Sequence, residues 1–582
     1  MKTSSLITRW NLNSLQYETD VKKFKNQMGM VKEKLLEIEK ESNLAVLRDS
    51  EVLKLSQLIS HIESAESFYY CLTTEDIEPS QLTSVIGIIS TLKSQVYSIV
   101  TNLEERVNEM NETQLTQWIN NTKQKSLLAE LVNNRKKNSQ QEKMISNFSR
   151  ETLSGLEDLY SQVRNNLKVE IGHAHVKKEI SFAEAMERAS VHPEQNERLH
   201  VFTELNRTLE AQSNIFASIY NQMVGIRLHE NKLKKIDYLD ESLKFNGITS
   251  QTLDAMWYAV DDNMKGLSSY FNKKEVVGTE KMSWHELMTS SQNVSFSVTY
   301  SQAADEIINS LATIDSDMSE FVKEALTKGW IDAEPRKTKS SGGFCAPFIQ
   351  EGESRISLSY DNTIDSARRL AHELGHAWHF KQMHDTPLLQ FTDDLLEMTM
   401  AETSSIFFET VFTNHMLQKA NDASVKKAIL GPKIERSLNY LMSIRGAYLF
   451  ENEFYQYRKE SPLDVRQIEE LSLICQEKAY GSSLREYEPY VWTKYVQFYQ
   501  ATIPFYNYPY SFGFLFSIGL LERAKEDEHF NRNFKSFLSE TGRLPLEQLV
   551  KNHFQIDLSQ PEFWQRAVQN IVRDIEQYKG LS

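Results

Sequence analysis

The sequence predicts a mainly α-helical fold, and three observations support this prediction. Glycine and proline together make up 32 of the 582 residues (20 + 12), roughly half of average usage. Ten of the twelve prolines lie at or after Pro335, so long helices can run uninterrupted before that point. Apolar residues also recur at alternating steps of three and four, the spacing of one buried helix face. In the first such segment they are Val21, Phe24, Met28, Val31, Leu35 and Ile38.

The remaining segments follow in chain order. The helical spacing returns over 45–70, 85–110 and 200–235. The polar stretch 133–141 is expected to be a connector, and Pro193 is expected in the first turn of a new helix. Between Ala333 and Tyr360, glycine-rich turns bound residues of alternating polarity, which predicts a small β-sheet. Beyond Thr363 we expect helices to the end of the chain.

Composition limits the classes of partner. The net charge of −15 (65 − 80) and the lack of a long basic run argue against nucleic-acid binding. The N-terminus lacks the apolar run of a signal peptide, and the most apolar stretch, 512–521, is too short to span a bilayer. Three distant cysteines predict no disulfide framework. We therefore expect a soluble cytoplasmic protein with no membrane association, whose state, monomer or homo-oligomer, the sequence leaves open.

Chemistry is concentrated in the motif His372-Glu373-Leu374-Gly375-His376. From 14 His and 80 acidic residues, a random His-acid-x-x-His is expected about 0.05 times, which bounds the His-Glu-x-x-His signature. On a helix, residues four apart share a face, so both imidazoles can reach one zinc ion. Glu373 could take a proton from a water activated by the metal. The alternative is a surface helix with two unrelated histidines.

Other histidines do not complete such a site. His285-Glu286 begins in the same way but lacks the second histidine, and His173-x-His175 is expected in a solvated turn. His379 lies two turns beyond His372, about 10.5 Å along the helix axis. We expect it to pack, or to support the site from outside the ligand set.

A catalytic zinc site needs a third protein ligand. Gln382 stands where a metzincin has its third histidine, so that class is excluded. A following helical run offers Glu397, Glu402 and Glu409. Glu402 is favoured, because a carboxylate among apolar residues is costly unless it is paired or metal-bound, and Glu397 is the least favoured.

Four stretches occur together in this chain: His-Glu-Leu-Gly-His-Ala-Trp-His at 372–379, Ala-Glu-Thr-Ser-Ser at 401–405 with Glu409, the glycine-led strands of 341–360, and Pro-Phe-Tyr-Asn-Tyr-Pro-Tyr-Ser-Phe-Gly at 504–513. In these stretches the chain resembles oligoendopeptidase F-type zinc metallopeptidases, of the thimet oligopeptidase and neurolysin superfamily. The similarity extends from about Leu153 to the C-terminus.

The resemblance implies roles for individual residues. His372, His376 and Glu402 would bind one zinc ion, and Glu373 would be the general base. Glu409 would orient a zinc-binding histidine from behind.

It also implies how a peptide would bind. Gly342, Gly343 and Phe344 would form a strand edge onto which an extended peptide adds. Tyr510, or else Tyr506, would stabilise the oxyanion.

The resemblance further implies a two-lobed helical metallopeptidase with a deep substrate channel and a small β-sheet beside the zinc site. Residues 1–110 would form an N-terminal helical region, 111–190 a helical domain like that N-terminal in oligopeptidase F, and 191–582 the catalytic domain. The implied activity is zinc-dependent hydrolysis of internal bonds in short peptides.

The chain also departs from the family. It has no histidine between His415 and His529, so Gln497 stands where relatives have an oxyanion-assisting histidine, and Phe514 replaces a common tyrosine. A catalytically weakened peptide-binding scaffold and a zinc carboxypeptidase are therefore the alternatives. The role of Cys345, beside the expected substrate edge, stays open.

Overall fold

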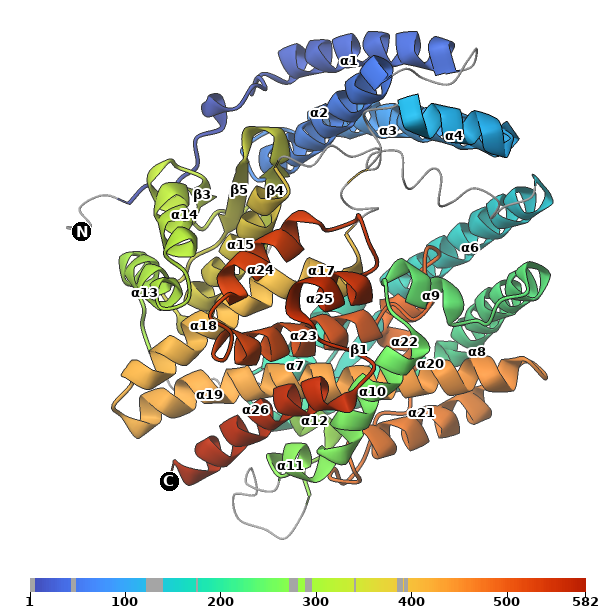
Figure 1. Cartoon of the computed structure of the whole chain (residues 1–582). Helices are drawn as coiled ribbons and strands as arrows, with labels where there is room; N and C mark the ends of the chain where they lie inside the picture. The colour runs from blue at the N-terminus through green and yellow to red at the C-terminus, as the bar shows by residue number, and fades with distance from the viewer. Residues whose placement is uncertain are drawn as a thin grey trace. The chain divides into compact units, whose positions relative to one another are not determined.

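The computed structural model describes residues 6–42, 49–121, 140–173, 176–271, 281–287, 296–339, 342–384, 391 and 396–581. The described chain is mainly helical with two small sheets, as predicted (Figure 1). It divides into two compact units, each assembled from three chain segments. Unit 1 comprises 1–137, 296–419 and 520–556, and unit 2 comprises 138–295, 420–519 and 557–582. The predicted boundaries near 110 and 190 rest on sequence character rather than compactness, so they stay a prediction.

Unit 1 contains the N-terminal helices, one sheet and the helix of the His-Glu-x-x-His motif. Its elements are η1 (Leu12–Ser14), α1 (Val21–Ser42), α2 (Asp49–Thr73), α3 (Pro79–Glu109), α4 (Glu112–Asn121), α13 (Tyr300–Ala312), α14 (Ser316–Thr327), β3 (Ile331–Asp332), β4 (Gly343–Phe348), η3 (Ile349–Glu351), β5 (Glu353–Leu358), α15 (Ile364–Gln382), α17 (Met398–Ala401), α18 (Thr403–Lys419), α24 (Phe530–Ser539) and α25 (Leu546–Phe554).

The apolar face predicted for the first helix is confirmed. Phe24, Met28 and Leu35 are fully buried in α1, within a cluster that includes residues of α2 and α3. Alternate residues of β4, Ala346 and Phe348, join the same cluster. The N-terminal helices thus cover one face of β4.

The predicted small sheet has the strand order β3-β5-β4, with β3 parallel and β4 antiparallel to β5. Gly343 pairs with Leu358, and Phe348 pairs with Glu353. Both β4 and β5 also pack on α15. Since successive residues of a strand face opposite sides, α2 and α15 contact different faces of β4.

Unit 2 is built mostly from long helices. Its elements are α6 (Gln140–Asn166), β1 (Lys168–His173), β2 (Val176–Ser181), α7 (Phe182–Val191), α8 (Gln195–Lys234), α9 (Asp240–Phe245), α10 (Ser250–Asp262), α11 (Met264–Ser268), α12 (Trp284–Leu287), α19 (Ala423–Leu438), η4 (Asn439–Ser443), α20 (Ile444–Arg458), α21 (Val465–Ala479), α22 (Val491–Lys494), η5 (Val496–Tyr499) and α26 (Pro561–Gly580). Helix α23 (Tyr508–Ala524) begins in unit 2 and ends in unit 1.

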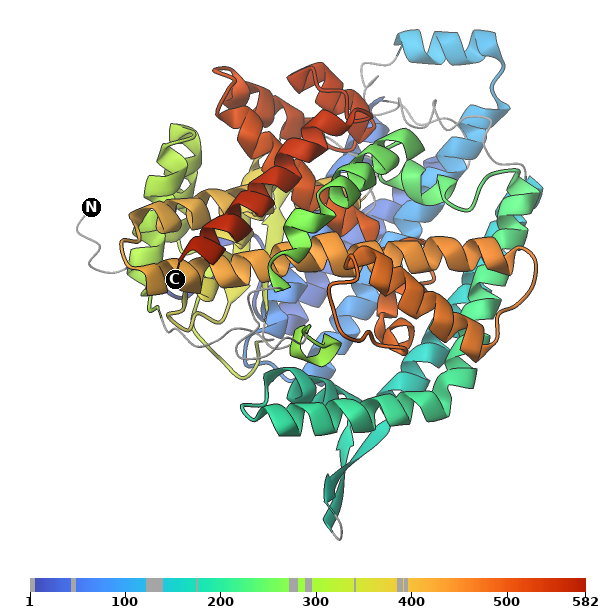
Figure 2. The same ribbon diagram turned by 90° about the horizontal axis from the view of Figure 1, so that it is seen from below.

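Two local expectations need correction or extension. Pro193 lies before the N-cap of α8, Glu194, and not in its first turn. The β1–β2 hairpin, which extends from the helices of unit 2 (Figure 2), was not predicted. The His173 of the expected solvated turn ends β1, whereas His175 and almost all of the polar stretch 133–141 lie outside the described residues.

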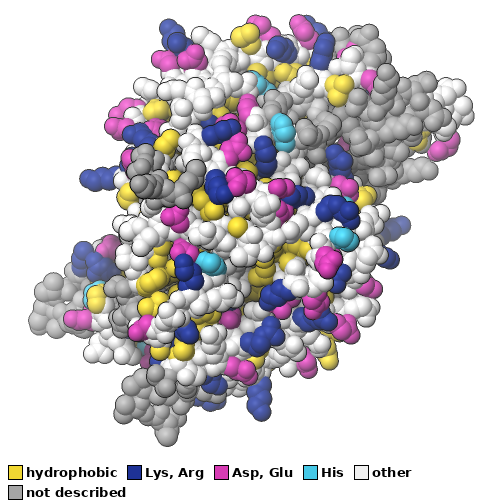
Figure 3. Space-filling model, turned by 60° about the vertical axis from the view of Figure 1, so that its left-hand side comes forward, with side chains coloured by type: hydrophobic (Ala, Val, Ile, Leu, Met, Phe, Trp, Pro, Cys, Tyr) yellow, Lys and Arg dark blue, Asp and Glu magenta, His cyan; other side chains and the backbone are white. Residues whose placement is uncertain are grey.

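The surface in Figure 3 carries acidic and basic side chains side by side, as is typical of a solvated face. No helix among the described residues is long and apolar enough to cross a membrane.

Candidate metal centre

The two motif histidines lie on one face of α15. Thr363 is the N-cap of this helix and forms a capping box with Ser366, and the helix continues without a break from Ile364 to Gln382. His372 and His376, one turn apart, have ring centroids separated by 4.9 Å. The predicted helical setting of the motif is confirmed.

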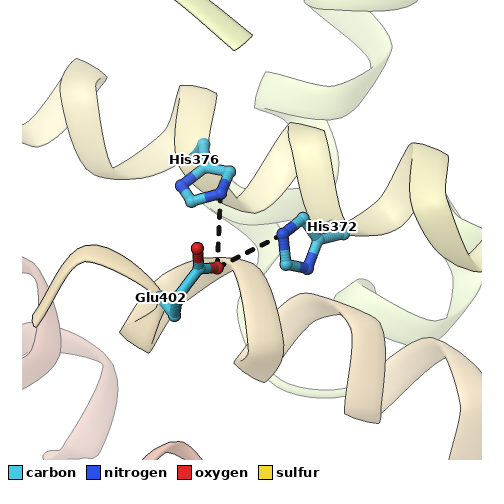
Figure 4. A group of neighbouring side chains, drawn as sticks. All are labelled: His372, His376 and Glu402. Carbon is cyan, nitrogen blue, oxygen red and sulfur yellow. Dashed lines mark ion pairs between the residues drawn. The ribbon is translucent and has the colours of Figure 1, made fainter. Parts of the chain in front are cut away.

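The carboxylate of Glu402 meets both rings. Its Oε2 atom lies 3.2 Å from His372 Nε2 and 3.4 Å from His376 Nε2 (Figure 4). The three ligand atoms all lie within 4.8 Å of one another, and no other such group of His, Cys, Asp or Glu occurs among the described residues. The predicted helical run is interrupted at Glu402, which caps α17, and α18 begins at Thr403.

The charges of this cluster support one another. Burial alone would raise the pKa of Glu402, but the two histidines hold it well below its usual range. Burial would likewise lower the pKa of His372, but Glu402 and Glu409 raise it to about 10. Two carboxylates facing one imidazole favour a positive charge between them, which is the electrostatic requirement of a cation site.

Behind His372 lies Glu409, on α18. Glu409 Oε2 is 3.0 Å from His372 Nδ1, so Nδ1 donates to the carboxylate and Nε2 points toward Glu402. Arg368, one turn before His372, donates to the same Glu409 oxygen at 2.8 Å. Arg368 was not among the predicted site residues, although its spacing of four from His372 places it on the same helix face.

The expected base, Glu373, is 6% exposed and faces the small sheet. Burial raises its pKa, against the opposing effect of His376 and His372. A Cβ atom added to Gly343 would lie 3.1 Å from Glu373 Oε1 and 3.2 Å from the Ser357 carbonyl oxygen. Gly343 therefore lets β4 approach Glu373 closely, and the predicted sheet beside the motif is confirmed.

Strand β4 is an edge strand of the described sheet. Of the residues predicted to contact the substrate, Gly342, just before β4, is exposed, whereas Gly343 and Phe344 in β4 are half-buried. Burial and the nearby Glu373 raise the pKa of Cys345 well above its usual range. The Cys345 thiol is therefore a weak nucleophile.

Helices α15 and α18 approach closely at Gly375. A Cβ atom at this position would lie 2.5 Å from both the Ser404 carbonyl oxygen and Ser405 Cα. Because both are backbone atoms, no side-chain rotation can relieve the contact. This glycine sets the spacing between the helix that carries the histidines and the one that follows Glu402.

The other candidates lie outside the cluster. His379 is fully buried and its Nε2 lies 2.9 Å from Thr541 Oγ1, so it packs, as expected. Burial raises the pKa of Glu397 to about 8, and its carboxylate accepts a hydrogen bond from the backbone of Leu546. His285 is buried, and its Nδ1 lies 2.6 Å from Ser283 Oγ.

The tyrosine segment belongs to unit 2. Tyr506 and Tyr510 are half-buried, with ring centroids 6.0 Å apart. Tyr508 is fully buried, and its hydroxyl oxygen accepts a hydrogen bond from Ser242 at 3.1 Å. The ring of Phe514 stacks on that of Tyr440, with centroids 4.7 Å apart.

A strained backbone precedes these tyrosines. Phe505 has φ of +58°, a conformation that costs a bulky residue on the order of 1–3 kcal/mol. Its N–H donates to Glu451 Oε1 at 2.9 Å, and its ring packs on Tyr238 and Tyr455. These contacts stabilise the strained conformation of Phe505.

The sequence pattern of peptidase family M3 matches residues 94–570, most of the chain. The chain belongs to peptidase family M3. It is a metalloendopeptidase, as the sequence predicts.

Individual proteins similar to this chain are also oligoendopeptidases or their homologues. An oligoendopeptidase F homolog from Borreliella burgdorferi is 22% identical over 558 residues, which cover 91% of this chain and 90% of that protein. Chromosomal oligoendopeptidase F from Lactococcus lactis subsp. cremoris is 22% identical over 53% of this chain, so the chain spans about half (52%) of that relative. The crystal structure of oligoendopeptidase-F from Enterococcus faecium has a TM-score of 0.69 at 16% identity, covering 97% of this chain and 99% of that one. The M3 chain thus shares the fold of these peptidases.

Proposed function

We propose that this M3 peptidase is a zinc-dependent endopeptidase of short peptides, in which His372, His376 and Glu402 hold one zinc ion per chain. The convergence of these three ligand atoms within 4.8 Å is the observation that carries the proposal. Two imidazole nitrogens and one carboxylate oxygen form a donor set that catalytic zinc sites use. The positive charge favoured beside His372 is compatible with a divalent cation.

The residues around the three proposed zinc ligands have separate roles in the reaction. When bound, zinc polarises the scissile carbonyl and makes water a stronger nucleophile. Glu373 removes a proton from the attacking water and returns it to the leaving amine. Its buried carboxylate, with a raised pKa, suits both transfers. Glu409 keeps His372 oriented by accepting its Nδ1 proton.

The edge of β4 offers a binding mode for the peptide. An extended peptide can add to this edge as a further strand, and the approach of β4 to Glu373 brings it beside the base. Gly342, Gly343 and Phe344 supply this edge. A deep channel, as in the family resemblance, would restrict substrates to short peptides.

Tyr510, with Tyr506 as the second candidate, stabilises the oxyanion in this proposal. Both side chains are half-buried, whereas that of Tyr508 is fully buried. By the family resemblance, Gln497 and Phe514 would stand where relatives commonly have a histidine and a tyrosine. We therefore expect slower turnover than in enzymes that retain both residues.

Zinc analysis and peptide cleavage test the proposal. A fluorescence-quenched peptide blocked at both termini is incubated with the wild type and with Glu373→Gln. We expect internal cleavage by the wild type and a loss of about 10²–10⁴-fold in the variant, with zinc content unchanged. Glu286→Gln is the matched control, because Glu286 follows a histidine in the same way but caps α12 instead. It should retain wild-type cleavage.

The same experiment separates the alternatives. A zinc-loaded wild type that cleaves neither the blocked peptide nor the same peptide with a free C-terminus more than Glu373→Gln does would be a peptide-binding scaffold. An enzyme that cleaves only peptides with a free C-terminus would be a carboxypeptidase. We also propose a cytoplasmic location, which the three free cysteines, Cys71, Cys345 and Cys475, favour.

A further inference from the structure

Ser405, in the first turn of α18, contacts the carboxylate that faces the two histidines. Its Oγ lies 2.7 Å from Glu402 Oε2 and 3.0 Å from the Glu402 carbonyl oxygen. A serine hydroxyl has a single proton, and the carboxylate oxygen is the nearer and the charged acceptor. The hydroxyl therefore donates to Oε2.

This oxygen is the same atom that lies within 3.4 Å of both histidine Nε2 atoms. A glutamate side chain can present either oxygen and can rotate about three bonds. A charge-assisted hydrogen bond to one oxygen removes much of that freedom before a metal arrives.

Ser405 is itself fixed. It is fully buried, and its Cα is one of the three backbone atoms of α18 that lie closest to a Cβ placed on Gly375 of α15. The position of the Ser405 hydroxyl is thus fixed relative to the helix that carries His372 and His376. The spacing between α15 and α18 therefore determines, through Ser405, where Glu402 Oε2 lies.

We propose that Ser405 is a positioning residue of the metal centre: its hydroxyl selects the Glu402 oxygen that coordinates and holds it toward the histidines. This inference rests on the proposed zinc site. A partner behind a metal ligand typically contributes 10–100-fold to metal affinity. Ser405 was not among the site residues predicted from the sequence.

The neighbouring Ser404 provides a matched control. It too is fully buried in α18, yet its hydroxyl has no hydrogen-bond partner among the described residues. Ser404→Ala and Ser405→Ala each remove one buried oxygen from adjacent positions. Only the second removes a contact to Glu402.

The test measures the zinc dissociation constant of the full-length protein by competition with a chromophoric chelator of known affinity. We expect Ser405→Ala to bind zinc 10–100-fold more weakly than the wild type, and Ser404→Ala to remain within about threefold. Thermal unfolding of the metal-free proteins checks that both variants fold. Cobalt-loaded Ser405→Ala should also show altered visible absorption, because the metal geometry is less constrained.

Equal zinc affinities and equal cobalt spectra for the two variants would overturn the role of Ser405, while a zinc-binding wild type would leave the proposed metal site intact. A wild type that binds no zinc would overturn both. A Ser405→Ala protein that does not fold, beside a folded Ser404→Ala, would make Ser405 structural and would also overturn the inference.

Discussion

Gly375→Ala is expected to disturb the proposed metal centre without replacing any of its ligands. The added Cβ would lie 2.5 Å from backbone atoms of Ser404 and Ser405, whereas carbon atoms pack at about 3.5–4.0 Å. Helices α15 and α18 must therefore separate by roughly 1 Å. Overpacking of this kind costs about 1–3 kcal/mol, while replacing a helical glycine returns about 0.5–1 kcal/mol. We expect a net loss of stability.

The displacement should matter more for zinc than for folding. Glu402 immediately precedes α18, so a shift of α18 moves the carboxylate away from the histidines. A loss of one ligand from ideal geometry should weaken zinc binding by at least tenfold, comparable to the loss of a supporting partner. Chelator competition at pH 7 measures this, and thermal unfolding of the metal-free protein measures the packing cost.

Gly87→Ala is the control. Gly87 lies on an exposed face of α3, where an added Cβ meets no atom within 4 Å. This variant should keep wild-type zinc affinity and be slightly more stable. If Gly375→Ala binds zinc as tightly as the wild type and unfolds no earlier than Gly87→Ala, the close helix contact does not set the ligand geometry.

Two predictions concern protons. Because Glu402 and Glu409 raise the pKa of His372 to about 10, zinc binding at pH 7 should release about one proton. Titration calorimetry in buffers of different ionisation enthalpy measures the number of protons released. A binding enthalpy that does not depend on the buffer would contradict a protonated His372 in the metal-free protein. Burial raises the pKa of Glu451 to about 7 from 4.5, against the Phe505 N–H and Arg227. Since an acid with a raised pKa stabilises the fold only while protonated, the wild type should lose stability as pH rises from about 4.5 through 7. Glu451→Gln keeps the acceptor for Phe505 and should flatten this profile, leaving the variant more stable at pH 8 by on the order of 1–3 kcal/mol; urea unfolding at pH 5 and 8 measures the difference, and parallel profiles would refute it.

The parts of the fold that depend on local pattern were predictable. The buried face of α1 follows from its apolar spacing, and the His372–His376 pair follows from the helical repeat of four. The strands β4 and β5 were identified from alternation between glycine-rich turns. Each of these features is decided by residues close together in sequence.

What the sequence did not reveal depends on packing between distant segments. The break in helix at Glu402 occurs where α18 is pressed against Gly375, a contact that no periodicity reports. Arg368 and Ser405 matter through what they touch, and both look like ordinary helix residues in sequence. The β1–β2 hairpin is different, because alternation at Val169 and Ile171 could have identified it.

The interleaving of the two units has a consequence for synthesis in the cell. The chain passes between the units five times, and the last segment of unit 1, 520–556, lies near the C-terminus. His379 of α15 contacts Thr541 in that segment. A nascent chain from which His372 and Glu402 have already emerged therefore still lacks part of the packing around them. Unit 1 should complete its fold only after nearly the whole polypeptide has left the ribosome, which makes early premature termination products poor candidates for a working metal centre.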